Sequence, residues 1–524
     1  MVIIEVDVNT PWVRGTFAKK KRHPMSFFGR RCYASGTKKL LASYPERNET
    51  LAKLQRSTRY PLLANRSPSI PVDRIQSIVK QYQDIEHEQQ PQTPLYEIRG
   101  RINNVRYAGK GLIFLDLIEG RSQIQVVMNA KKLGKPLEDS EKQMHELIRR
   151  GDSVSAIGRP WRTRAGELSI LSTEAIKMLS PSLHPLPDTS AGRAIRKHNR
   201  VAELKAFEDA KDVLRARSLI VTAISDFLQK RDFLMVTTPH LSAQKGGASA
   251  NTFDTRLEDG RALHLRVAPE LWLKRLIIGG FDRVFEIGYS YRNEGIDATH
   301  NPEFTTCEFY MSFADLNALK VLTHDMLVYV ATQVREQFPK FSDNCSVILS
   351  PWKTIDFVHE IEKKINGPLK FDLTYLRGLC DAASLETSPG DDVAKLLDKL
   401  AAHYIEPQCE MPTFVENHPS IMAPLAKDFN RNEMILSKRF ELFIGGREYV
   451  NAYEEENDPS VQLEKLSIQD PSIPDRSFVE ALEWGLPPTG GWGLGIDRLT
   501  MLLTGSERIN DVLSFGDLNQ VRRL

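Results

Sequence analysis

Carboxylates and aromatic side chains alternate in a strand-like segment near the middle of this 524-residue chain. Over residues 304–313, a repeat of two would place Phe304, Glu308 and Tyr310 on one face and mostly apolar side chains on the other. One face then packs against a core, and the other is left to do chemistry. A solvated hairpin surface is the alternative, but such a surface seldom combines aromatic side chains with carboxylates at strand spacing.

A second strand-like segment, residues 284–292, precedes the first, and the loop between them is charged. Antiparallel pairing would bring Arg292, at the end of this segment, close to Glu308. The loop itself adds Glu294 and His300. Because arginine and histidine favour a polyanion, the hairpin predicts a site that binds a polyanion next to a cluster of acids.

A second set of carboxylates occurs near the C-terminus, in RFELFIGGREYVNAYEEENDP at 439–459. Glu441 and Glu448 are seven residues apart, which places them on opposite faces of regular strands. An extra residue at Gly445-Gly446 would form a β-bulge and bring both acids to one side. Two carboxylates together with nucleotide phosphates suit Mg²⁺. Exposed acids on an edge strand are the alternative interpretation.

Two more segments carry candidate residues. GGWGLGIDRLTML is expected to run from a strand into a helix that begins near Asp497. Its likeness to GxGxxG is a weak signal, because no strand with a ribose-binding acid follows. In LHLRVAPELWLKRLIIGG, residues 263–280, a strand leads through Pro269 into a helix with Glu270 in its first turn. An acid at that position is often only a favourable partner of the helix dipole.

Length and composition predict a folded chain with at least two domains. Lys and Arg total 70 against 68 Asp and Glu, a net charge of +2, so nucleic-acid binding would require a local patch. No apolar run approaches the roughly 20 residues that span a bilayer, so we expect no membrane insertion. The five widely spaced cysteines predict neither a zinc site nor a disulfide framework, and they favour a reducing compartment.

Residues 96–179 contain five strand-like segments, with one helical segment at 139–150. This pattern predicts an OB-fold, a small barrel whose exposed face can stack unpaired bases. A purely structural barrel is the alternative. The proline-containing segment 180–188 predicts an extended linker, and a helix over 202–230 and a strand over 233–241 are expected to follow.

Several of these motifs resemble those of the class II aminoacyl-tRNA synthetases. FLMVTTPHL is similar to the first signature of that family, YRNEG with HNPEFT to the second, and GLPPTGGWGLGIDR to the third. The closest likeness is to the lysyl branch, because Ala268-Pro269-Glu270 stands where aspartyl and asparaginyl members typically have Ser-Pro-Gln. The resemblance covers roughly Leu95 to the C-terminus. It implies an α+β fold, with an antiparallel sheet flanked by helices and preceded by the OB-fold barrel.

The resemblance also implies activity and site residues. The chain would activate lysine with ATP to lysyl-adenylate and transfer it to the 3′ end of tRNA(Lys), as a homodimer that uses Mg²⁺. The domains would be a basic N-terminal extension (1–75), the anticodon-binding OB-fold (92–180), a linker (181–205) and the catalytic domain (206–524). The lysine pocket would comprise Glu270, Arg292, Glu308, Tyr310, Asn451 and Glu455. ATP would contact Arg292, Glu294, His300, Phe304, Glu441, Glu448 and Arg498. Of these residues, Glu441 and Glu448 would hold Mg²⁺, and Arg292 and Arg498 would be catalytic. The anticodon would meet Arg106, Phe114 and Gln125.

The N-terminal stretch 14–66 is rich in Arg, Lys and Ser and has very few acids before Glu46. It resembles a mitochondrial presequence, which predicts the mitochondrial matrix. Glu5 and Asp7 depart from that pattern, and a start at Met25 would give a cleaner leader. A cytoplasmic enzyme with a basic tRNA-binding extension is the alternative.

Two other functions stay open at this level. A synthetase for aspartate or asparagine would need a cationic pocket, whereas this chain offers three glutamates. A catalytically inactive paralogue, acting in RNA binding or regulation, would have lost residues for ATP or Mg²⁺. The residues that argue against such a loss are Arg292, Glu441, Glu448 and Arg498.

Overall fold

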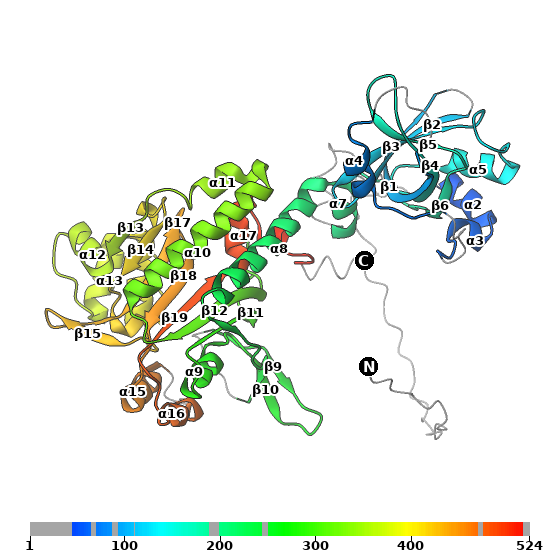
Figure 1. Cartoon of the computed structure of the whole chain (residues 1–524). Helices are drawn as coiled ribbons and strands as arrows, with labels where there is room; N and C mark the ends of the chain where they lie inside the picture. The colour runs from blue at the N-terminus through cyan, green and yellow to red at the C-terminus, as the bar shows by residue number, and fades with distance from the viewer. Residues whose placement is uncertain are drawn as a thin grey trace, which may run out of the picture. The chain divides into compact units, whose positions relative to one another are not determined.

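The computed structural model divides into two compact units, Met1–Pro185 and Leu186–Leu524 (Figure 1). The described residues are 45–63, 70–85, 93–108, 111–187, 199–243, 250–469 and 475–516. Residues 1–44, with most of the expected leader, lie outside them. No helix in these described ranges is both long enough and apolar enough to cross a membrane.

The first unit is built around a barrel. Its strands are β1 (Tyr96–Tyr107), β2 (Leu112–Glu119), β3 (Ser122–Asn129), β4 (Ser153–Arg162), β5 (Leu168–Ser172) and β6 (Lys177–Ser180). They follow the order β1-β2-β3-β5-β4-β6, and pairing of β1 with β4 closes the barrel. Leu115 and Leu117 alternate into its core, as a period of two requires. Helix α5 (Asp139–Leu147) lies between β3 and β4, so the predicted OB-fold is confirmed.

Helix α2 (Pro45–Lys53) comes from the stretch expected to be a basic extension, yet it packs on the first unit. The Arg47 guanidinium is buried, with Nη2 2.6 Å from Asp152 Oδ2 and Nε donating to the Leu147 carbonyl at 2.7 Å. Leu51, one turn further along, is 1% exposed. The folded unit therefore includes α2, which composition alone did not indicate.

The second unit contains an eight-stranded sheet that is antiparallel except for its two edge pairings. The strand order is β13-β14-β17-β18-β19-β12-β11-β7. The strands are β7 (Leu234–Met235), β11 (Arg283–Tyr291), β12 (Glu303–Ser312), β13 (Lys353–Asp356), β14 (Thr413–Glu416), β17 (Arg439–Ile444), β18 (Arg447–Glu454) and β19 (Thr489–Gly495). Because β19 lies between β12 and β18, it joins the two carboxylate-bearing segments into one surface.

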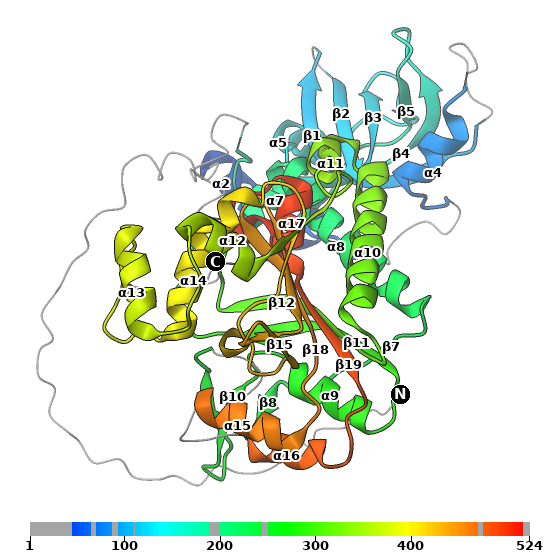
Figure 2. The same cartoon turned by 90° about the vertical axis from the view of Figure 1, so that its left-hand side faces the viewer.

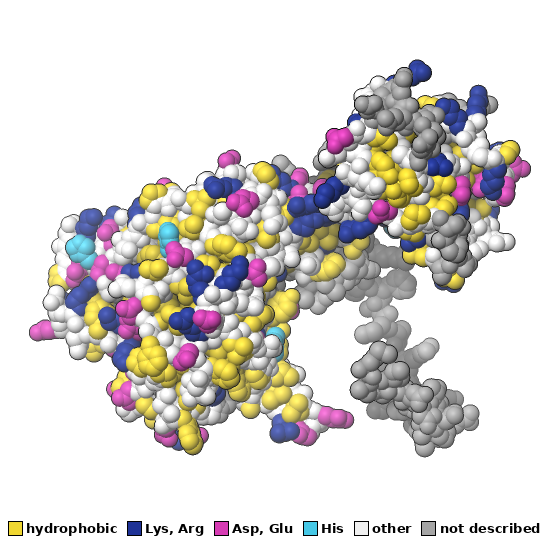
Figure 3. All heavy atoms as spheres, viewed as in Figure 1, with side chains coloured by type: hydrophobic (Ala, Val, Ile, Leu, Met, Phe, Trp, Pro, Cys, Tyr) yellow, Lys and Arg dark blue, Asp and Glu magenta, His cyan; other side chains and the backbone are white. Residues whose placement is uncertain are grey.

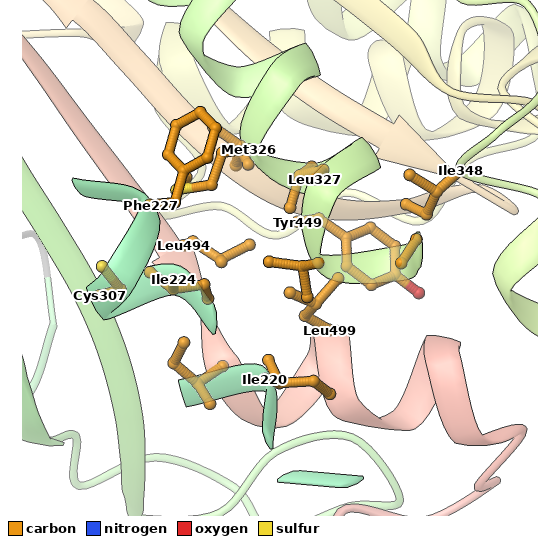
Figure 4. Close-up of a cluster of buried hydrophobic side chains, with 14 of the residues drawn as sticks. Ile220, Ile224, Phe227, Cys307, Met326, Leu327, Ile348, Tyr449, Leu494 and Leu499 are labelled. Carbon is orange, nitrogen blue, oxygen red and sulfur yellow. The ribbon is translucent and has the colours of Figure 1, made fainter. Parts of the chain in front are cut away.

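Three helices cover one face of this sheet: α8 (Glu208–Gln229), α10 (Leu316–Gln337) and α17 (Ile496–Thr504) (Figure 1). Figure 4 shows Ile220 of α8, Met326 of α10 and Leu499 of α17 around Leu494 of β19. Phe309, from the expected apolar face of β12, belongs to the same core and is fully buried. The opposite face of the sheet is therefore left for polar side chains.

That opposite face carries helices toward its two ends. Helices α9 (Glu270–Ile278) and α16 (Arg476–Leu482) pack with Tyr310 in one apolar cluster. Helices α12 (Phe357–Ile365), α13 (Leu373–Ala382) and α14 (Val393–Tyr404) pack with Phe443 in another. Figure 2 shows α15 (Pro459–Gln469) and α16 next to α9. Tyr310, one of the candidate residues, thus belongs to the first of these two clusters.

Short elements complete the two units. They are α3 (Arg56–Arg59), α4 (Ile75–Tyr82), α7 (Arg200–Ala206), β8 (Leu241–Ser242), β9 (Asp254–Arg256), β10 (Ala262–Leu265), α11 (Ser342–Ser346), β15 (Asp428–Arg431), β16 (Met434–Ser437) and α18 (Ile509–Val512). Local signals set some helix ends: Asp315 accepts from the Ala318 amide at the start of α10, and Gly505, with φ of 67°, ends α17. Basic and acidic side chains are interspersed on the second unit in Figure 3, in keeping with the net charge of +2.

Candidate active site

A row of residues crosses five strands of the second unit on the face opposite α8 and α10. The register pairs Glu441 with Asn451, Asn451 with Gly493, Gly493 with Glu308, and Glu308 with Glu286. Residues directly opposite each other in a sheet point to the same face. The sheet thus brings the middle hairpin and the C-terminal acids onto one surface.

A β-bulge places Glu448 on this surface too, but at a different position from the one expected. The register of β17 with β18 shifts beside Tyr449, which is the extra residue. Gly445 and Gly446, where we expected the bulge, form the hairpin turn instead, with φ of 58° and 67°. The predicted location was wrong because both glycines, with positive φ, form the two-residue turn that links Ile444 to Arg447 and so lie outside the strand pairing. The expected consequence holds, since Glu441 and Glu448 share one face.

Two basic side chains hold Glu441. Arg439 Nη2 forms a short ion pair with Glu441 Oε1, and His418 Nε2 donates to Oε2 at 3.1 Å. Burial opposes ionisation, but Arg439 and His418 outweigh it and lower the pKa of Glu441 to about 2. Burial, together with the charge of Glu441, raises the pKa of Glu448 to about 7. The pair therefore holds one carboxylate that is ionised and a second that is partly protonated near neutral pH, and an added cation would favour ionisation of the second.

Three buried carboxylates from separate elements meet beside β19. Glu270 begins α9, Glu308 lies in β12 and Glu455 follows β18, with exposures of 7%, 8% and 1%. Tyr310 donates to Glu308 at 3.5 Å, and Tyr453 donates to Glu270 at 2.6 Å. Burial, and next the charge of Glu270, raises the pKa of Glu308 to about 8. Burial likewise raises the pKa of Glu455 well above its usual range. Three acids in so little water favour a bound cation.

One cation is built into this acid pocket. Lys274 is fully buried on α9, one turn after Glu270, and its Nζ lies 2.7 Å from Glu270 Oε1. It also forms a short ion pair with Glu455 Oε2. Burial by itself lowers the pKa of Lys274, but the charges of Glu270 and Glu455 outweigh burial and raise it, so the ammonium stays charged. Sequence analysis missed Lys274, although its i,i+4 spacing from Glu270 was a usable signal.

A glycine of β19 makes room for the acid pocket. Gly491 lies opposite both Tyr310 and Tyr453 in the sheet. A Cβ at this position would lie 1.9 Å from Glu455 Oε1 and 2.7 Å from Tyr310 Cε1, so only glycine permits this close approach. Within the described part of the chain, Glu455 Oε1 is buried and has no hydrogen-bond partner. That oxygen is available to a ligand.

Another group of predicted site residues gathers where β11 ends and β12 begins. The guanidinium carbon of Arg292 lies 5.2 Å from the ring centre of Phe304. Arg498 Nη2 donates to His300 Nε2 at 2.8 Å, and Arg498 Nη1 lies 4.0 Å from Glu448 Oε2. Arg292 Nε is buried and finds no hydrogen-bond partner among the described residues. These guanidinium groups suit an anion that offers several oxygen acceptors.

Two other predicted residues, Glu294 and Asn451, differ in exposure and in hydrogen bonding. Glu294 is exposed in the loop after β11 and makes no hydrogen bond or ion pair with any described residue. Asn451 lies in the row and accepts a hydrogen bond from Arg439 Nε at 2.9 Å. Arg439 thus orients both Asn451 and Glu441, and sequence analysis missed it, although it stands two residues before Glu441 at strand spacing. His418 was missed as well, because only the folded loop brings it to Glu441.

The remaining candidates lie on the outer face of the barrel in the first unit. Arg106 of β1 pairs with Phe114 of β2, and its guanidinium carbon lies 5.6 Å from the phenyl centre. Gln125 of β3 shares this face but is 4% exposed. It donates to Glu167 at 2.8 Å and accepts from the Ser169 hydroxyl at 3.2 Å. Arg106 is exposed and Phe114 is half-buried, whereas Gln125 is already engaged within the barrel.

Comparison with known protein families agrees with this architecture. The family described as tRNA synthetases class II (D, K and N) matches residues 192–519, and the OB-fold nucleic acid binding domain matches residues 96–177. The chain belongs to this class II synthetase family.

Three similar proteins are all named lysine–tRNA ligases. The mitochondrial lysine–tRNA ligase of Schizosaccharomyces pombe is 40% identical over 452 residues, covering 81% of this chain and 84% of the relative. The mitochondrial lysine–tRNA ligase of Saccharomyces cerevisiae is 35% identical over 490 residues, 84% of each chain. The lysine–tRNA ligase of Deinococcus radiodurans is 37% identical over 437 residues, 80% of this chain and 81% of the relative.

Proposed function

We propose that this chain is a lysine–tRNA ligase that activates lysine with ATP and transfers the lysyl group to tRNA(Lys). The observation that carries the proposal is the acid pocket of Glu270, Glu308 and Glu455, in which Lys274 supplies one positive charge against three carboxylates. A ligand ammonium pairs with the buried acids in their ionised form, whereas a neutral side chain brings them no charged partner, so lysine is favoured over a neutral amino acid. Aspartate would add a fourth carboxylate to the same pocket.

Lysine fits this pocket along its length. The ε-ammonium lies between Glu308 and Glu455, where the buried Oε1 of Glu455 lacks a partner among the described residues. Tyr310 adds a hydrogen bond, and Glu270 helps to hold an amino group. The lysine carboxylate then points toward Arg292, whose charge also acts on Glu308. Asn451, oriented by Arg439, lines the same pocket.

The nucleotide is assigned to the group at the β11–β12 loop. Arg292 holds the α-phosphate and the lysine carboxylate, and its buried, unpartnered Nε supports that role. Phe304 and Arg498 contact the two faces of adenine, and His300, already bonded to Arg498, meets the outer phosphates. Glu294 receives the adenine amino group, and its exposed position leaves its side chain able to do so.

The chemistry requires no side-chain nucleophile. A carboxylate oxygen of lysine attacks the α-phosphorus, a new P–O bond forms, and the bond to the bridging oxygen of the β-phosphate breaks. Pyrophosphate leaves with that electron pair. The terminal ribose hydroxyl of tRNA then attacks the activated carbonyl carbon, loses its proton, and displaces AMP. The protein contributes positioning and charge: Arg292 brings two anions together and stabilises charge on the pentacoordinate phosphorus.

The donor set of Glu441 and Glu448 fits a magnesium ion. Both are carboxylates on one face, and burial followed by the charge of Glu441 raises the pKa of Glu448, so an added cation would favour its ionised form. Hard oxygen ligands from one or two carboxylates plus phosphates are what Mg²⁺ prefers. When bound, the ion would screen the charge of the nucleotide phosphates. Arg439 and His418 orient Glu441 for this purpose.

The outer face of the barrel is assigned to the anticodon. The Arg106 guanidinium carbon lies 5.6 Å from the centre of the half-buried Phe114 ring, and we expect a base to lie against this ring. Gln125 reads a base only by exchanging its bonds to Glu167 and Ser169 for bonds to the base. The OB-fold match over residues 96–177 supports nucleic-acid binding by this unit.

Assembly and location complete the proposal. Edge strand β7 exposes Leu234 and Met235 by 46% and 50%, and an apolar edge strand of this kind supports a homodimer. Sedimentation of the purified chain tests this. The mitochondrial names of two relatives and the basic stretch 14–66 support import into the mitochondrial matrix. The N-terminus of the mature protein, determined from cells, tests the location.

Amino-acid-dependent ATP–pyrophosphate exchange tests the activity. We expect exchange with lysine and none with aspartate or asparagine. Exchange with aspartate alone would make the chain a sister synthetase, and absence of exchange with all three would favour the inactive paralogue. Charging of tRNA(Lys) in the same preparation tests the second step.

A further inference from the structure

Lys274 has no role in the reaction described above, yet its side chain is 0% exposed. Fully buried lysines are rare, because removing an ammonium group from water is costly unless other charges replace the water. The contacts of Lys274 supply that replacement. They therefore indicate why a lysine, and not an apolar residue, occupies this position.

The Lys274 ammonium connects two carboxylates from different elements. It lies 2.7 Å from Oε1 of Glu270, on its own helix, and forms a short ion pair with Oε2 of Glu455, beyond the end of β18. The rings of Tyr453 and Phe478 lie 5.6 Å from Nζ and enclose it. Lys274 thus holds α9 and the end of β18 in one arrangement.

The ion pair also selects which oxygen of Glu455 remains. Both oxygens of Glu455 are buried and make no hydrogen bond with the described residues, but Oε2 forms the ion pair with Lys274 and Oε1 lies over Gly491 without a charged partner. Without the ammonium, Glu270 and Glu455 would repel each other, and Glu455 would turn away or take up a proton. The acceptor for a ligand ammonium would then be lost.

We propose that Lys274 is a positioning residue that determines specificity: it is a fixed counter-cation that aims Glu455 at the ε-ammonium of the substrate. This inference rests on the proposed lysine–tRNA ligase activity. The two possible roles of Lys274 predict opposite changes in the affinity for lysine when its charge is removed. If Lys274 acted only through its charge, its removal would make the pocket more negative and tighten the binding of lysine. A positioning role predicts the opposite.

Substitution of Lys274 by methionine separates these possibilities, because methionine keeps most of the volume and removes the charge. In pyrophosphate exchange we expect K274M to raise the KM for lysine by at least about 30-fold, as for truncation of one partner of a buried ion pair. The KM for ATP should change by less than about threefold, because the nucleotide group is separate. K399M is the matched control, since Lys399 forms a remote ion pair with Asp391 at 2.6 Å.

Chemical rescue is a second test, because an added cation should restore activity only if the charge of Lys274 is what the pocket needs. In K274A the missing atoms correspond to n-propylammonium. Adding that cation should restore lysine-dependent exchange by at least about fivefold in K274A and leave K399M unchanged. Absence of rescue in a folded K274A, or a lysine KM in K274M that is within about threefold of wild type or lower, overturns the role of Lys274.

If K274M or K274A does not fold, a double variant still tests the proposal. In the double variant K274M/E455Q the ion pair is replaced by neutral groups, and we expect a KM for lysine within about threefold of that of E455Q alone. If the KM increases of K274M and E455Q multiply in the double variant, Lys274 does not act through Glu455. If the wild-type protein shows no exchange with lysine, the proposed function and the role of Lys274 are both overturned. If the wild-type protein is active but the KM of K274M for lysine does not rise, only the role of Lys274 is overturned.

Discussion

Raising the pH from about 6 to about 8 should tighten the binding of lysine to the nucleotide-free protein. Burial raises the pKa of Glu308 to about 8, with Glu270 as the next cause and Arg292 opposing it. Below that pH, Glu308 is mostly protonated in the empty pocket. A bound ammonium favours the carboxylate, so lysine binding must release the proton, and that cost falls as the pH rises.

The size of the effect follows from this pKa. We take one proton released and a pKa of Glu308 in the complex below about 6. Kd is then proportional to 1 + 10^(8 − pH), where about 8 is the pKa of Glu308 in the empty pocket. That factor is about 100 at pH 6 and about 2 at pH 8, so Kd should fall about 50-fold, or about 2 kcal/mol. Near pH 7 lysine binding should release close to one proton. Both amino groups of free lysine stay largely protonated over this range.

Isothermal titration calorimetry in two buffers of different ionisation enthalpy measures both Kd and the proton count. Glu308→Gln is the matched control: it should bind lysine more weakly than wild type, lose most of the pH dependence, and change ATP affinity much less. A wild-type Kd that varies by less than about threefold between pH 6 and 8 would refute the reasoning. Equal losses of lysine and ATP affinity in Glu308→Gln would remove Glu308 from the lysine pocket.

Three substitutions test other parts of the molecule. Gly491→Ala should lower lysine-dependent exchange by about 100-fold, because its Cβ would displace Glu455; Gly390→Ala, in open space, should leave exchange unchanged, and equal behaviour of the two contradicts the packing argument. Phe114→Ala should weaken tRNA binding by about 1–3 kcal/mol without affecting pyrophosphate exchange, and an unchanged KM for tRNA in charging assays counts against the anticodon surface. Arg47→Met should lower the unfolding free energy of the first unit by about 3–5 kcal/mol, measured by denaturant titration, and a loss below about 1 kcal/mol would show that the buried ion pair does not fix α2.

Alternation along single strands could be predicted from the sequence because it depends only on the local backbone. Glu308 and Tyr310 must share a face and Phe309 must take the other wherever β12 pairs. The barrel strands and the start of α9 at Glu270 follow from equally local signals. Short motifs near Arg292 and Arg498 added the family resemblance, which the matches over residues 192–519 confirm.

Tertiary structure decided which groups meet. Insertion of β19 between β12 and β18 places Glu308 and Glu441 in one row, and no local pattern contains that information. The bulge lies beside Tyr449 because the turn needs both Gly445 and Gly446. Lys274 reaches Glu455 only because α9 packs over the end of β18. Charge pairs and pKa values depend on distances between remote segments, so they emerge only when the chain has folded.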